Sequence, residues 1–67
     1  MMVGDLVKVL FPVEDSGDGI TGERLWVKLT KLGPDRFQGI LKNQPVVVDL
    51  EYNQLVSFPK NNIVSIT

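Results

Sequence analysis

The sequence predicts an all-β fold, built as a small, antiparallel and strongly bent sheet of five to six strands. Short stretches of alternating or β-branched apolar residues fill most of the 67 residues, and each stretch ends at a turn signal. No apolar stripe with helical spacing extends over three turns. So many strands in so short a chain must curl, because sheets twist and a flat sheet would leave both edges exposed.

One predicted strand precedes an acidic, glycine-rich segment, and a second predicted strand follows it. The first runs from Gly4 to about Phe11 and ends at Pro12. Residues 13–22 hold three acidic residues and three glycines, which indicates a loop. The second strand covers residues 23–30. Alternation along it places Leu25, Val27 and Leu29 on the inner face and Arg24, Trp26, Lys28 and Thr30 on the outer face.

A turn at Gly33-Pro34-Asp35 precedes a third predicted strand, at residues 36–42. Its outward residues are Gln38, Ile40 and Lys42. Gly39 lies in the middle of this strand, where glycine often marks a bulge or a bend. The alternative is that Gly39 makes room for the indole of Trp26 across the strands.

The pattern in the last third of the chain predicts a fourth strand, a fifth strand and a short closing strand. Residues 46–50 follow the turn 43–45, and this pattern directs Val46, Val48 and Leu50 inward. A second turn at 51–53 leads to a strand at 54–58, then to a single helical turn at 59–62 and a last strand at 63–66. A strand, a turn containing proline and a short strand form the ending of many SH3-like barrels, so a partly open SH3-like barrel is favoured over an OB-like one.

Composition limits the class of protein. Residues 1–67 are enough for one small domain. The absence of cysteine excludes disulfides and thiolate metal sites and favours the cytoplasm. No apolar run is long enough to cross a membrane, and no basic region followed by an apolar one opens the chain. The net charge of −1 lacks the basic excess typical of nucleic-acid binders.

Three segments carry a resemblance to a known family. They are Glu23-Arg24-Leu25-Trp26-Val27, then Gly39-Ile40-Leu41-Lys42-Asn43-Gln44-Pro45, then Leu55-Val56-Ser57-Phe58-Pro59 with Ile63 after it. Residues 23–66 resemble, in these segments, small uncharacterised bacterial β-domains, some of which occur among immunity proteins of toxin systems. The resemblance implies a β-barrel that binds another protein, and it implies no catalytic or ligand residues.

Catalysis and metal binding are poorly supported by the residue types. Without histidine or cysteine, neither a Ser–His nor a Cys–His pair can form. Asp15 and Asp18 lie in a glycine-rich loop that cannot hold two carboxylates in a fixed geometry. Residues 14–20 share alternating oxygen ligands with an EF-hand loop, but Leu25 stands where the bidentate glutamate belongs. We therefore expect no enzyme activity, no cofactor and no metal.

The outer face of the sheet provides the candidate site. If the two turns centre their hairpins, Trp26, Ile40 and Val47 form an apolar stripe across three strands, with Arg24 and Tyr52 at its rim. An aromatic anchor within polar residues is typical of protein-interface hot spots. The alternative is that the loop 13–22 folds over Trp26 and buries it.

These patterns predict a non-enzymatic, cytoplasmic protein-binding module that acts through the stripe, with an immunity-like role implied by the resemblance. A first alternative is a small β-barrel that binds nucleic acid, in which Arg24, Lys28 and Lys42 flank Trp26. A second is a homo-oligomeric structural protein that associates through a strand edge or through the same stripe.

Overall fold

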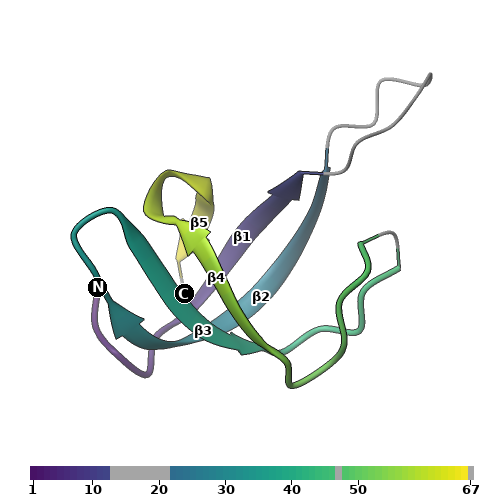
Figure 1. The fold of residues 1–67 in the computed structure, drawn as a ribbon, viewed down its shortest axis with the longest axis horizontal. Helices are drawn as coiled ribbons and strands as arrows, with labels where there is room; N and C mark the ends of the chain where they lie inside the picture. The colour runs from purple at the N-terminus through teal and green to yellow at the C-terminus, as the bar shows by residue number, and fades with distance from the viewer. Residues whose placement is uncertain (13–21, 47, 67) are drawn as a thin grey trace.

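A computed structural model describes residues 1–12, 22–46 and 48–66, and it places five antiparallel strands in one sheet (Figure 1). The strands are β1 (Leu6–Pro12), β2 (Gly22–Leu32), β3 (Arg36–Leu41), β4 (Leu55–Pro59) and β5 (Ile63–Ile66), with a single 3₁₀ turn, η1 (Lys60–Asn62), before β5. Their order in the sheet is β4-β3-β2-β1-β5. The predicted fold class is confirmed: the chain forms an all-β, antiparallel and bent sheet.

The bend of the sheet follows from the distance between two aromatic rings. β1 and β4 are separated by two strands, so a flat sheet would place them about 14 Å apart. The ring centroids of Phe11 in β1 and Phe58 in β4 are nevertheless 6.3 Å apart, with an edge-to-face angle of 77°. The sheet therefore folds back on itself, and β4 crosses over β1 and β2 in Figure 1. The edge strands β4 and β5 do not pair, so the sheet is not closed into a barrel.

The core lies on the concave, inner face of this bent sheet. Alternation along β1, β2, β3 and β4 directs the core residues inward, as the sequence predicted for β2 and β3. Phe37 packs edge-on against Phe58 with the centroids 6.5 Å apart, which extends the aromatic part of the core. The buried members are Val7, Val9, Leu25, Val27, Leu29, Leu41, Val56 and Phe58.

Gly39 allows β2 and β3 to approach closely. A Cβ atom at this position would clash with Cγ1 of Val27 and would lie 2.5 Å from the carbonyl oxygen of Lys28. The register of the two strands shifts between Leu29 and Lys31, directly across from Gly39. A bulge is therefore present in β2, whereas the sequence indicated a bulge or a bend in the glycine's own strand. The space that Gly39 leaves is occupied by Val27 and the backbone, not by the indole of Trp26.

The predicted strand at residues 46–50 is wrong for the residues that the structure describes there. Val46 is 86% exposed rather than inward, although Val48 and Leu50 do pack against the core. The Glu23 carboxylate accepts hydrogen bonds from the amides of Val46 and Val48, at 2.8 and 3.1 Å. A side chain thus binds the amides that a neighbouring strand would otherwise bind. The position beside β3 belongs to β4 instead.

The predicted ending of the chain is confirmed. Asn53, in the turn before β4, has a φ of 68°, a left-handed conformation that asparagine tolerates better than most residues. After β4, the η1 turn redirects the chain so that β5 pairs with β1. The side chain of Asn62 fixes this crossing, since its Nδ2 donates to the carbonyl oxygen of Leu10 at 3.1 Å. Within the described residues no helix is both long and apolar enough to cross a membrane.

Candidate interaction surface

The outer face is the side of the sheet opposite the core, and the strand register defines which residues share it. Residues paired directly across an antiparallel ladder point to the same side. Lys28 of β2 pairs with Ile40 of β3, which in turn pairs with Leu55 of β4. Trp26 lies two residues from Lys28, so it is diagonal to Ile40 on the same face. We call Trp26, Ile40 and Leu55 the outer apolar cluster.

The side chains of the outer apolar cluster are not part of the buried core. All eight buried apolar residues lie on the inner face, whereas Leu55 is 57% exposed and both Trp26 and Ile40 are half-buried. Isolated exposed apolar residues are ordinary, but a half-buried tryptophan next to two aliphatic side chains on adjacent strands is a feature of interaction surfaces. The cluster therefore provides apolar area for a contact outside the fold.

Lysines cover the aromatic rings of this face. Lys8 pairs with Trp26 across β1 and β2, and its Nζ lies 5.0 Å from the centroid of the indole. On the other side, the amide of Lys42 donates to the carbonyl oxygen of Trp26 at 2.8 Å. The Nζ of Lys42 donates to Oδ1 of Asn53 at 2.9 Å and lies 5.8 Å from the ring of Tyr52. Cation–π attraction stabilises both pairs and keeps positive charge on the face.

Cationic side chains gather on the outer side of the sheet. Six of the seven cationic residues of the chain hold outward positions in β1, β2 and β3 or directly after β3. Within the described strands, the one acidic residue, Glu23, has an inward position. The whole chain has seven positive and eight negative side chains, so the remainder after removing these six carries 1 − 8 = −7. The six are Lys8, Arg24, Lys28, Lys31, Arg36 and Lys42.

Two polar side chains hold the segment after β3 against β2. Oδ1 of Asn43 accepts a hydrogen bond from the backbone amide of Trp26 at 2.5 Å. Glu23, three residues earlier in β2, binds the amides of Val46 and Val48. Both Asn43 and Glu23 belong to the segments that carry the family resemblance, so those motif positions have a structural role here. Asn43 fixes the backbone of Trp26, and Glu23 fixes the backbone of Val46 and Val48.

The structure brings together some of the predicted site residues. Trp26, Ile40 and Arg24 share the outer face, and Tyr52, which is 53% exposed, lies beside it under Lys42. Val47 lies outside the described residues, and no strand forms on either side of it. Its predicted place opposite Ile40 is taken by Leu55. The alternative, in which the loop 13–22 covers Trp26, depends on residues 13–21, which lie outside the described part of the chain.

Sequence reasoning missed Leu55 and Lys8 as members of this surface. Leu55 is outward by simple alternation with the buried Val56 and Phe58, a signal that the sequence does contain. It was missed because residues 46–50 were assigned to the neighbouring strand. Lys8 is outward by the same rule, but its position over Trp26 depends on the register between β1 and β2. That register is set across a loop whose geometry the sequence does not specify.

The described residues provide no candidate metal centre. No three side chains of the types His, Cys, Asp and Glu come together within that part of the chain. The calcium-like residues 14–20 lie outside it. No protein-family model, curated protein or solved structure matches this chain. The resemblance to the bacterial β-domain family accordingly stays a prediction.

Proposed function

We propose that this protein is a non-enzymatic, cytoplasmic binding module whose outer face holds an acidic surface of a protein partner. The observation that carries the proposal is the outer apolar cluster surrounded by lysine and arginine on a face that has no acidic strand residue among those described. The strand order and the η1 turn before β5 also support the SH3-like interpretation, which concerns the fold and carries no function.

The face has the composition of an interaction surface with a charged rim. Interface hot spots are enriched in tryptophan, tyrosine and arginine, and their centres exclude water. Trp26, Ile40 and Leu55 supply the apolar centre, and the surrounding cations supply complementarity to carboxylates. A typical interface covers about 800 Å² on each partner. The accessible surface of the protein is 4497 Å², so such a contact would cover roughly a fifth of it.

The charge distribution favours a different protein as the partner over a second copy of this chain. A face with six cations repels an identical face, so association through two outer faces is opposed. An acidic partner meets no such repulsion, and the cations of the outer face attract it. An immunity-like role, in which the partner is a toxin, is supported by the family resemblance.

The test replaces the indole at the centre of the cluster. Trp26→Ser should leave the circular dichroism spectrum and cooperative unfolding intact, because Trp26 is not part of the core. Affinity capture with tagged protein from nuclease-treated lysate of the source cells should recover an acidic protein with the wild type. Loss of a hot-spot tryptophan should raise the Kd for this partner by at least about thirtyfold, and the recovery should fall accordingly.

A matched control removes apolar surface elsewhere. Val64, in the edge strand β5, is exposed, and Val64→Ser should capture the same partner as the wild type. If Trp26→Ser unfolds the protein, the indole belongs to the core and the proposal is wrong. If Val64→Ser and Trp26→Ser reduce capture equally, the outer face is not the contact.

Single-stranded nucleic acid is a second candidate, and the gathering of six cations on the face that holds Trp26 favours it. Aromatic side chains in a positively charged groove bind bases by stacking and phosphates by charge. Against it, the Lys8 ammonium occupies a position over the indole where a base would stack. Fluorescence anisotropy with a labelled oligonucleotide decides between the two. Affinity that falls at least about tenfold between 50 and 200 mM salt would favour nucleic acid.

A further inference from the structure

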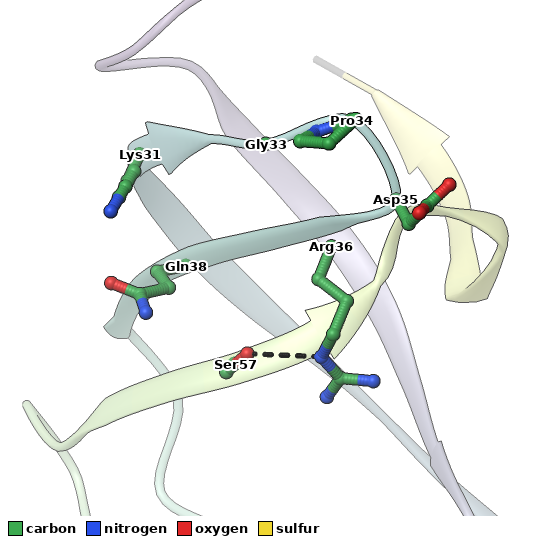
Figure 2. A pocket seen from close by; sticks show the side chains of 7 residues that line it. All are labelled: Lys31, Gly33, Pro34, Asp35, Arg36, Gln38 and Ser57. Carbon is green, nitrogen blue, oxygen red and sulfur yellow. Dashed lines mark hydrogen bonds between the residues drawn. The ribbon is translucent and has the colours of Figure 1, made fainter.

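A hollow of about 410 Å³ lies on the outer face beside the turn that joins β2 and β3 (Figure 2). The turn at residues 33–35 forms one wall, closed by a hydrogen bond from the amide of Gly33 to the carbonyl oxygen of Arg36 at 2.9 Å. Four of its polar side chains come from three adjacent strands, and a fifth, Asp35, comes from the turn. The four are Lys31 of β2, Arg36 and Gln38 of β3, and Ser57 of β4.

The β-bulge in β2 directs Lys31 into this hollow. In a regular strand Lys31 would follow the inward Leu29 by two residues and would also point to the core. The register shift between Leu29 and Lys31 adds one residue, so Lys31 pairs with the outward Gln38. Gln38 pairs in turn with Ser57. The bulge thus completes a row of three polar side chains across three strands, and bulges often redirect a side chain in this way at functional sites.

Arg36 is held beside the same row by Ser57. Its Nε lies 3.3 Å from Oγ of Ser57 and donates to it. The terminal guanidinium nitrogens of Arg36 extend beyond Ser57, on the side away from Lys31 and Gln38, and the Ser57 hydroxyl keeps its own proton to donate. Figure 2 shows Lys31 and Gln38 extending to one side of Ser57 and Arg36 to the other, so the space over the hydroxyl is flanked by donors on both sides.

The electrostatics of the hollow favour an anion. Lys31 and Arg36 make no ion pair within the described part of the chain. Asp35 also lines the hollow, but its carboxylate points away from Lys31 and Ser57 in Figure 2. Two cationic side chains, an amide and a hydroxyl therefore line the hollow together with one carboxylate, so the charged groups of its lining are positive on balance.

We infer that this hollow binds the phosphate group of a phosphate monoester. A phosphate monoester carries close to two negative charges at neutral pH and offers three strong acceptor oxygens, which matches two cations and two neutral donors. A carboxylate offers one charge and two oxygens and would leave donors unused. The hollow is a site separate from the outer apolar cluster, so binding here requires no partner at Trp26.

The test is a titration of the ¹⁵N-labelled protein with O-phosphoserine, with serine and acetate as control ligands. O-phosphoserine should produce saturable amide shifts at Gln38, Ser57 and the turn 33–35, whereas serine and acetate should not. Lys31→Gln and Arg36→Gln should each weaken binding about tenfold, because each removes a hydrogen bond to a charged group. Both side chains are exposed, so the variants should retain the wild-type fold and spectrum.

Lys28→Gln is the matched control, since it removes one charge from the same face outside the hollow. It should change the affinity by less than about twofold, because exposed charges at a distance are screened. If Lys28→Gln weakens binding as much as Lys31→Gln, the ligand responds to diffuse charge and the site is refuted. Inorganic phosphate identifies the source of the group: binding of inorganic phosphate without binding of O-phosphoserine would overturn the assignment to an ester.

Discussion

Adding a single methyl group at Gly39 should destabilise the protein strongly. Gly39→Ala places a Cβ against Cγ1 of Val27 and 2.5 Å from the carbonyl oxygen of Lys28, well inside van der Waals contact. The strands β2 and β3 must then separate by several tenths of an ångström. Overpacking of this kind costs about 1–3 kcal/mol. A domain of this size has a total stability of about 3–10 kcal/mol, so the loss is a substantial fraction.

Thermal unfolding followed by circular dichroism measures this effect. A loss of about 2 kcal/mol should lower Tm by roughly 8–16 °C in a domain of this size. In a Val27→Ala background the same substitution should cost less, because one of the two clashing groups is gone while the Lys28 carbonyl remains. A Gly39→Ala protein that unfolds at the wild-type temperature would refute the close approach of β2 and β3.

Three further predictions concern the core and the segment after β3. Phe58→Ala should cost about 3–5 kcal/mol and leave much of the protein unfolded at 25 °C by circular dichroism, because Phe58 is buried and packs on two other rings. Glu23→Gln should speed hydrogen exchange at the amide of Val46, which loses a carboxylate acceptor, and unchanged exchange would contradict that bond. Asn43→Ala should lower the free energy of unfolding by about 1–3 kcal/mol, whereas Asn61→Ala, at an exposed position, should leave it unchanged.

The strands that could be predicted are those whose pattern is alternating. In β2, leucine and valine alternate with polar residues and tryptophan, and a one-residue slip would expose the whole set, so face and register are both specified. The same rule holds for β4, where Val56 and Phe58 alternate with exposed residues. The ending was predictable because Pro59 follows the apolar strand and begins a single turn.

The wrong prediction at residues 46–50 has a physical reason. A run of β-branched residues fits a strand, but strand formation also needs backbone partners. Here Glu23, which is distant in sequence, binds the amides of Val46 and Val48. No local pattern reports a bond between residues that are more than twenty positions apart. The segment therefore packs beside the sheet as an irregular loop.

The candidate site was predictable in part for the same reasons. Alternation alone placed Trp26, Ile40 and Arg24 outward. The gathering of cations on that face was hidden by the net charge of −1, because the chain carries eight acidic residues and none of those that the structure describes has an outward position in a strand. The row formed by Lys31, Gln38 and Ser57 depends on a bulge, and a bulge inverts the face that alternation assigns.

Quenching of the single tryptophan tests the central claim most directly, since it needs neither a partner nor a variant. The claim is that Trp26 lies at the surface within a cluster of cations, with the Lys8 ammonium 5.0 Å from its ring. Iodide should accordingly quench the emission more strongly than caesium in the folded protein, and the preference should shrink as salt rises. Emission that neither ion quenches, or that caesium quenches better than iodide, would contradict a half-buried tryptophan on a cationic outer face.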